Sequence, residues 1–184
     1  MSKVVTAIAG FVVMLVLAIP AGAAGTYNGG DGSAEHPYEI DNATQLISLS
    51  QHSEDWDKCF ILTDDIDMGP NVTGIPPFTT ALIAPDTDLN SNYFQGTPFT
   101  GIFNGNGFVI SNITIHTTGA DSDYLGFFGN IDDPNAIVKN LGIKNIFITG
   151  GDDSDYIGGL AGSNSSMITQ CYTTGMIFGN GVLG

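Results

Sequence analysis

The chain contains no arginine and only four lysines, so positive charge is almost absent from it. Nineteen acidic residues oppose these lysines and give a formal net charge of −15 at pH 7. A nucleic-acid partner is excluded, because a phosphate backbone needs cationic side chains to neutralise it. Anionic membrane surfaces are disfavoured for the same reason. Such an excess of acidic over basic residues is compatible with an extracellular protein, with a protein from a salty habitat or with bound divalent cations. Composition does not distinguish these three cases.

Cysteine is also scarce, with Cys59 and Cys171 as the only two. A secreted protein can hold a disulfide. The internal repeat described below, however, separates these residues by three layers of strands, each about 4.8 Å apart. That separation exceeds the ~7 Å Cα limit for a bridge. We therefore expect both to be small buried apolar residues without a disulfide.

Long apolar runs are absent after the first residues. Met1–Lys3 carries one positive charge, Val4–Ile19 is almost wholly apolar, and a proline and small residues follow. This order predicts a secretory signal peptide over residues 1–24. The alternative is an uncleaved membrane anchor, although the run is short for a span of about 20 residues. We expect a secreted protein or one on the outer surface of the cell.

What the chain does contain is an internal repeat. Asp121–Gly126 returns as Asp153–Gly158, a shift of 32 residues. Phe108–Ile115 is echoed by Ala136–Ile143 and, more loosely, by Ser166–Thr173, at shifts of 28 and 30 residues. Such periods are typical of proteins in which each repeat buries its apolar face only by stacking on its neighbours.

The three copies of the second motif align apolar residues in four columns, and each column is expected to form one buried row. The columns are Val109, Ile137 and Met167; Ile110, Val138 and Ile168; Ile113, Leu141 and Cys171; and Ile115, Ile143 and Thr173. If the chain turns a corner between the second and third columns, the side chains of these two columns point to the same face of the repeat. Asn112, Asn140 and Gln170 occupy that corner. Asn tolerates the left-handed backbone of a corner better than Gln does, and stacked amides can hydrogen-bond from copy to copy.

A strand, a corner, a second strand and Gly-rich turns recur once in every 28 to 32 residues. This pattern predicts an all-β fold, a right-handed parallel β-helix (β-solenoid), over residues 99–184. An antiparallel β-sandwich with strands of similar spacing is the alternative. The Gly-rich segment Gly179–Gly184 resembles the start of another turn. We expect a truncated array whose uncapped last repeat invites end-to-end stacking.

Residues 25–98 are predicted to form an N-terminal cap and loop region. Asp41 and Asn42 can cap a short helix over Ala43–Gln51. Cys59–Leu62 is predicted to form a strand. Residues 69–98 contain five prolines and are predicted to form a long loop, with a short strand around Ala81–Ile83.

These segments resemble a known family. Tyr156–Gly162 followed by Met167–Gly175 resembles the GLUG motif of bacterial and archaeal surface proteins. Phe99–Ile115 is similar to the lead-in that precedes GLUG repeats, and Phe60–Met68 to the strand found upstream. The resemblance spans about residues 27–184 and implies an extracellular, pectate-lyase-like β-helix, often within adhesin-like chains. GLUG motifs also occur in some secreted IgA-cleaving metallopeptidases, outside the catalytic domain, and the family has no agreed catalytic residues.

Aspartates gather in three places, at Asp64, Asp65 and Asp67, at Asp121 and Asp123, and at Asp152, Asp153 and Asp155. Asp beside Gly and Ser commonly makes turns, whereas paired carboxylates can bind calcium or hydrolyse glycosides. Calcium is the better-supported functional alternative, because Asp121 and Asp153 would repel each other on successive layers without a cation between them. No EF-hand loop or nonapeptide calcium repeat is present. We assign no metal and no cofactor, and leave calcium open.

No catalytic set is recognisable. The histidines, His36, His52 and His116, are scattered, and neither a zinc-protease motif nor a nucleophile elbow occurs. We expect His116 at the solvent end of a strand. Pectin-cleaving β-helix enzymes use basic residues on acidic sugars, and only three lysines follow the signal peptide, Lys58, Lys139 and Lys144. An acidic chain would also repel polyuronate.

Two further sets of residues are candidates for surface roles. Three tyrosines can stack on sugar rings, or two of them can form a ladder with each other: Tyr124, Tyr156 and Tyr172. Four asparagines head glycosylation sequons, Asn42, Asn71, Asn112 and Asn164. A glycan on Asn112 would obstruct the predicted corner.

The sequence therefore predicts a non-catalytic extracellular or cell-surface module that acts in adhesion, matrix or surface structure. Its expected partners are surface polysaccharide or other surface proteins, without nucleic acid and without membrane insertion of the mature chain. The alternative is a carbohydrate-active β-helix enzyme, a polysaccharide hydrolase or lyase, in which Asp64 and Asp65 perform the chemistry.

Overall fold

A computed structural model describes residues 25–69, 77–88, 91, 93–117, 122–151 and 154–179. Several predictions concern residues outside these ranges. They are the signal peptide at 1–24, the sequon at Asn71, the aspartates Asp121, Asp152 and Asp153, and the Gly-rich end from 180 onward.

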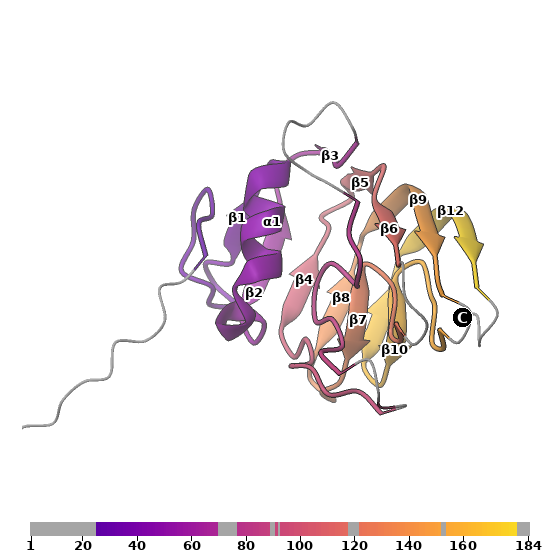
Figure 1. Cartoon of the computed structure of the whole chain (residues 1–184). Helices are drawn as coiled ribbons and strands as arrows, with labels where there is room; N and C mark the ends of the chain where they lie inside the picture. The colour runs from indigo at the N-terminus through magenta and orange to yellow at the C-terminus, as the bar shows by residue number, and fades with distance from the viewer. Residues whose placement is uncertain are drawn as a thin grey trace, which may run out of the picture.

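The described chain is mostly strand, arranged in parallel sheets with one α-helix and one 3₁₀ turn, as an all-β fold requires (Figure 1). One sheet has the strand order β1-β2-β4-β8-β11, a second β12-β9-β5-β3, with β6 also paired to β9, and a third β10-β7. The bounds are β1 Tyr38–Ile40, α1 Ala43–Gln51, η1 Ser53–Asp55, β2 Cys59–Leu62, β3 Ile66–Asp67, β4 Ile102–Asn104, β5 Val109–Ser111, β6 Thr114–His116, β7 Phe128–Ile131, β8 Ile137–Lys139, β9 Gly142–Thr149, β10 Ala161–Asn164, β11 Met167–Thr169 and β12 Tyr172–Phe178.

The last two repeats stack in the predicted register. Residues 161–178, with β10, β11 and β12, form what we call the terminal layer, and each of its strands pairs in parallel with one strand of residues 128–149, the preceding layer. Ile137 pairs with Met167, Val138 with Ile168, and Ile143 with Thr173. Every pairing between named strands is parallel. The antiparallel sandwich is therefore wrong.

The register predicted for the first copy is also wrong. Val109 pairs with Gly142, not with Ile137, and Ile115 pairs with Ile148. The strand that pairs with β8 is β4 instead. The predicted register is wrong because β9 is long enough to pair with both β5 and β6 across a second corner. Ile113 nevertheless lies in the same core as Leu141, and Cys171 packs against that core.

Corners between strands use left-handed backbone, as predicted. Asn112, Asn140 and Gln170 have φ of 62°, 54° and 55°. Asn140 and Gln170 share one corner, since their neighbours Lys139 and Thr169 are paired. Asn112 instead lies beside Asn145 (φ 54°), whose side-chain Nδ2 donates to Asn112 Oδ1 at 3.3 Å. Side-chain amides therefore do hydrogen-bond between layers, although the partner of Asn112 is Asn145 and not Asn140.

Side chains from all three sheets fill the centre of the stack. The core is rich in phenylalanine, and the rings of Phe60, Phe99, Phe103, Phe127 and Phe128 contact one another at centroid distances of 4.8–6.4 Å. All five are almost completely buried. Aromatic pairs add to the stabilisation that burial itself provides, so these rings tie adjacent layers together.

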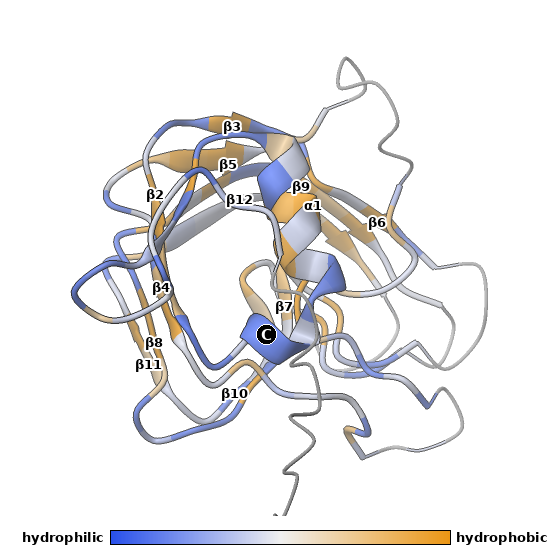
Figure 2. Cartoon of the chain, turned by 90° about the vertical axis from the view of Figure 1, so that its left-hand side faces the viewer, coloured by the Kyte–Doolittle hydropathy of each residue, from blue (hydrophilic) through white to orange (hydrophobic). Residues whose placement is uncertain are grey.

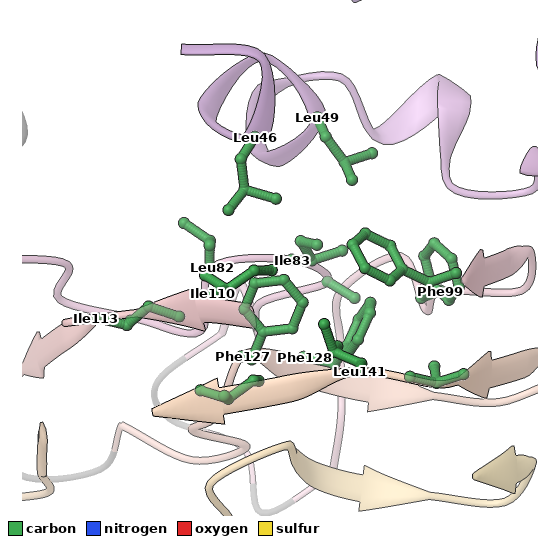
Figure 3. Packing of buried hydrophobic residues seen from close by; sticks show 14 of the residues in the cluster. Leu46, Leu49, Leu82, Ile83, Phe99, Ile110, Ile113, Phe127, Phe128 and Leu141 are labelled. Carbon is green, nitrogen blue, oxygen red and sulfur yellow. The ribbon is translucent and has the colours of Figure 1, made fainter. Parts of the chain in front are cut away.

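Helix α1 closes the N-terminal end of the stack. Its bounds match the prediction, and the side chain of its N-cap residue Asn42 accepts a hydrogen bond from Gln45 N at 3.1 Å. Viewed along the stack, α1 lies in front of the ring of strands (Figure 2). Leu46 and Leu49 project from it towards the core side chains below (Figure 3), and Trp56 Nε1 donates to the Leu49 carbonyl at 2.9 Å.

The loop after β3 is partly described. Ala81, Leu82 and Ile83 are buried, but the short strand expected there is reduced to a single parallel bridge between Ile83 and Phe128. Strand β2 matches its predicted bounds. Because β1 and β2 belong to the same sheet as β4, β8 and β11, the described part of the N-terminal region is continuous with the repeats.

We predict that Leu46→Ala lowers the free energy of unfolding by about 2–5 kcal/mol, because it leaves a cavity between α1 and the core. Thr44→Ala, at an exposed position of the same helix, should change it by less than about 0.5 kcal/mol. Urea unfolding followed by circular dichroism measures both. Equal effects of the two substitutions would show that α1 does not seal the core.

Candidate functional site

The first acidic cluster is engaged in turn formation and strand pairing. Asp64 Oδ1 accepts from Asp65 N at 2.8 Å, and Asp65 Oδ1 accepts from Val109 N at 2.8 Å. Asp67 Oδ1 accepts from Gly69 N at 2.9 Å. These bonds fit the structural interpretation of the aspartates, in which their carboxylates satisfy backbone N–H groups at turns and strand edges.

A ladder of polar side chains begins at Asp67 and crosses the layers. Asn112 Nδ2 donates to Asp67 Oδ1 at 2.7 Å, Asn145 Nδ2 donates to Asn112 Oδ1, and Asn145 N donates to Thr174 Oγ1 at 3.4 Å. The hydrogen bond from Asn112 is the main reason that the pKa of Asp67 lies below its usual value. The ladder links side chains of successive layers at the outer corner.

Asp123 and Asp155, the described members of the second and third acidic clusters, lie on successive layers, as the repeat predicts. Leu125 forms a parallel bridge with Ile157, and Asp155 N donates to Asp123 Oδ1 at 2.6 Å. The rings of Tyr124 and Tyr156 stack at 4.7 Å with an interplanar angle of 9°. Both tyrosines have left-handed φ, 55° and 58°, which is unusual for a bulky side chain. The predicted tyrosine ladder is confirmed, whereas Tyr172 lies apart from it on β12.

Asp121 and Asp153, between which calcium was considered, lie outside the described residues. Among the residues described, no three His, Cys, Asp or Glu side chains lie close enough together to hold an ion. An open pocket of about 540 Å³ lies beside the N-terminus of α1, with Asp41, Asp65 and Asp67 in its lining. Those carboxylates already accept hydrogen bonds or face solvent, and nothing in the pocket marks a reacting centre.

Two buried carboxylates were missed by the sequence analysis. Asp55 Oδ2 accepts from Tyr27 Oη at 2.8 Å and from Gly25 N at 2.7 Å, and burial together with this bond raises the pKa of Tyr27. Asp86 Oδ1 accepts from Thr87 N at 2.8 Å and from Gln95 N at 2.8 Å. The Pro-Asp step at Asp86 is a turn signal, but its distant partner could not be inferred. Both residues organise loops.

The remaining candidates are dispersed. His116 is the exposed last residue of β6, as predicted. His52 Nδ1 lies 2.7 Å from the Ser48 carbonyl, and His36 is exposed near the start of the described chain. Lys58 pairs with Asp57 at 2.8 Å. Lys139 contributes to a separate small pocket, and Lys144 lies exposed on β9. No catalytic constellation is formed by these residues.

The cysteines are free, as expected, but only half-buried rather than buried. Cys59 lies on β2, and Cys171 follows β11, with β4 and β8 between these strands in the sheet. Burial raises the pKa of both thiols, which disfavours the nucleophilic thiolate.

Three of the sequon asparagines are described, and each uses its side-chain amide in hydrogen bonds. Asn42 caps α1, Asn112 lies in the ladder, and Asn164 Oδ1 accepts from Ser166 N at 3.1 Å. At Asn112 the bonded atom is Nδ2, the atom that would carry a glycan, and the predicted obstruction concerns that corner.

The terminal layer is the surface that stands out. Several of its large apolar side chains are exposed, and one of them, Ile168, pairs with a residue that is completely buried one layer earlier. Ile168 is 36% exposed and its partner Val138 0%. The other exposed members of this surface are Met167, Tyr172, Met176 and Phe178, and Tyr156 lies just before the layer.

No family model matches the chain, so the GLUG resemblance stays a prediction. No solved structure matches it either. The chain is 32% identical over 162 residues to Halomucin of Haloquadratum walsbyi, a match covering 84% of this chain and 2% of that protein. It is 31% identical over 146 residues to a Gly-rich membrane protein of Evansella cellulosilytica, covering 77% of this chain and 15% of that protein. The chain thus spans a small fraction of the length of the relatives it matches.

None of the helices in the described ranges is both long and apolar enough to cross a bilayer.

We predict that Asn112→Gly raises the pKa of Asp67 towards the ordinary value of about 3.9, because the amide donor is removed while glycine keeps the left-handed corner. A lowered carboxyl pKa stabilises the fold above the unfolded-state pKa, and this stabilisation is lost as the pH falls through the folded-state value. The Asn112→Gly variant should therefore lack part of this stabilisation.

Carbon-13 NMR titration of the side-chain carboxyls measures the shift. Asn145→Gly is the matched control, because it removes the next hydrogen bond of the ladder and leaves the Asn112–Asp67 bond in place. An Asp67 pKa that moves equally in both variants would contradict the assigned cause.

Proposed function

We propose that this chain is a non-catalytic module of the cell surface or extracellular matrix, built as a right-handed parallel β-helix of the GLUG type. The observation that carries the proposal is the stacking of parallel strands without a catalytic constellation among the described residues. The module would act in adhesion, matrix or surface structure, with surface polysaccharide or other surface proteins as partners.

The relatives support the location. The names Halomucin and Gly-rich membrane protein point to a surface or membrane-associated protein, and each match covers a small part of a much longer chain. A stacked repeat suits such a context, because layers added along one axis extend the molecule without requiring a new core. Export would depend on the predicted signal peptide, residues 1–24.

The chemistry of the surface supports the absence of catalysis. Glycoside hydrolysis needs two carboxyl groups held on opposite sides of a bound sugar. Asp64 and Asp65 instead accept backbone hydrogen bonds at a turn and a strand edge. The tyrosines Tyr124 and Tyr156 stack on each other, so the ring faces between them are not available to a ligand.

We expect a membrane-impermeant amine-reactive label to modify this chain on intact cells as fully as after lysis. The reactive groups are Lys58, Lys139, Lys144 and the terminal α-amine, and a variant with all three lysines replaced by arginine is the control that keeps the terminal amine alone. A cytoplasmic protein in the same cells reports leakage. Labelling that requires lysis would contradict the surface location.

We also expect no release of reducing ends or unsaturated sugars from a panel of neutral and acidic polysaccharides. Asp64→Asn and Asp65→Asn should behave as the unsubstituted protein does. Turnover that disappears in either variant would overturn the non-catalytic assignment and favour the carbohydrate-active alternative.

A further inference from the structure

The segment that follows the predicted signal peptide is held against the N-terminal end of the stack from its first residue. The backbone nitrogen of Gly25 donates to Asp55 Oδ2 at 2.7 Å. The next nitrogen, Thr26 N, donates to Ser48 Oγ on α1, also at 2.7 Å. Tyr27 Oη then donates to the same oxygen of Asp55 at 2.8 Å. These contacts hold the Gly25 nitrogen beside a carboxylate.

The carboxylate of Asp55 is buried and has no cationic partner within 4 Å among the residues described. Asp55 is 3% exposed. The one ion pair in the described part of the chain joins Lys58 to Asp57. The two donors to Asp55 Oδ2, the N–H of Gly25 and the hydroxyl of Tyr27, are both neutral. Because a buried charge is costly unless it is paired, a cation placed beside Asp55 would stabilise the fold.

Position 25 has no room for a side chain. A Cβ atom added to Gly25 would lie 2.7 Å from Tyr27 Cζ and closer still to Tyr27 Oη, and it would lie 3.0 Å from Ser48 Oγ. Any larger residue would therefore displace the Tyr27 ring or move the backbone away. Glycine permits this close approach of the backbone, so the Gly25 nitrogen reaches Asp55.

The sequence before Gly25 offers two cleavage points to a signal peptidase, which requires small residues at the first and third positions before the cut. Gly22 and Ala24 meet this requirement for a cut after residue 24, and Ala21 and Ala23 meet it for a cut after residue 23. The sequence does not choose between them. Only the cut after Ala24 turns the nitrogen beside the buried carboxylate into a free amine.

We propose that a signal peptidase cleaves the Ala24–Gly25 bond and that the new α-ammonium group of Gly25 forms an ion pair with Asp55, which stabilises the N-terminal end of the stack after export. This inference rests on the proposed export of the chain. Water adds its hydroxyl to the Ala24 carbonyl carbon as the C–N bond breaks, and its proton goes to the Gly25 nitrogen. The ordinary α-amine, with a pKa of about 7.7–8.0, binds a further proton at neutral pH. A neutral donor to Asp55 thus becomes a charged one, and charge-assisted hydrogen bonds are roughly twice as strong as neutral ones.

N-terminal sequencing and intact mass of the chain recovered from outside the producing cells test the cleavage. We expect Gly25 as the first residue. A chain that begins at Ala24, or one that is not cleaved, would overturn the proposal. Neither result would contradict the proposed surface function, because an uncleaved chain can still be labelled on intact cells. Labelling that requires lysis contradicts that function instead, so the two failures are distinguishable.

Urea unfolding of the exported chain, with its α-amine either free or acetylated, tests the ion pair. Acetylation is the matched control, because it keeps one N–H of Gly25 for Asp55 and removes only the charge. At pH 6.5 the acetylated chain should have an unfolding equilibrium constant about tenfold larger, which corresponds to an amine pKa raised by about one unit in the folded state. In Asp55→Asn, acetylation should change this constant less than about twofold.

The pH dependence separates the charge from any steric effect of the acetyl group. A carboxylate partner raises the amine pKa in the folded state. The stabilisation is therefore complete below the unfolded-state value of about 7.7–8.0 and is lost as the pH rises through the folded-state value of about 9. The difference between the free and acetylated chains should shrink over this range. The other titratable groups around Asp55 are present in both chains and cancel from the difference: Tyr27, Tyr38, His52, Glu54 and Lys58.

Two results would contradict the ion pair. One is a difference between the free and acetylated chains that persists unchanged at high pH, and the other is a difference equally large in Asp55→Asn. If Asp55→Asn does not fold, carbon-13 NMR titration of the Gly25 Cα in the unsubstituted chain gives the amine pKa directly. A value at or below the ordinary 7.7–8.0 would then overturn the proposal.

Discussion

Parallel backbone pairing between layers is the constraint on which the rest of the structure depends. Each strand of the terminal layer pairs with a strand about 30 residues earlier, and the same pairing continues to β1 and β3. Since pairing fixes register, it also fixes which side chains form continuous rows through the core. The phenylalanine cluster, the tyrosine pair and the amide ladder all follow from that register. A shift of one residue would move every row to the wrong face.

The surface follows from the same constraint. Side chains at equivalent positions recur at short intervals along the stack, so like groups are brought together unless they can bond. The carboxylate of Asp123 accepts a hydrogen bond from the backbone N–H of Asp155. The carboxylate of Asp67 accepts one from the side-chain amide of Asn112. These carboxylates are therefore accommodated in the stack by hydrogen bonds.

Local signals predicted local structure well. Asn42 and the apolar spacing behind it defined α1, and the apolar run of β2 gave its bounds. The register of the first repeat failed because one corner pattern occurs twice within a layer. The segment around Asn112 resembles those around both Asn140 and Asn145, and only the long β9 strand decides between them. The tyrosine ladder could be found from the repeat, whereas the role of Asp86 depends on a partner nine residues away.

The chain has a single tryptophan, Trp56, and it is 5% exposed beneath the C-terminal end of α1. Its indole N–H is bonded to the Leu49 carbonyl. Tryptophan emission therefore reports only whether the end covered by α1 is folded. If the molecule frays from the end that carries β12, this fluorescence will stay constant while far-ultraviolet circular dichroism already falls. A difference between the unfolding midpoints from fluorescence and from circular dichroism would then show that the layers unfold independently.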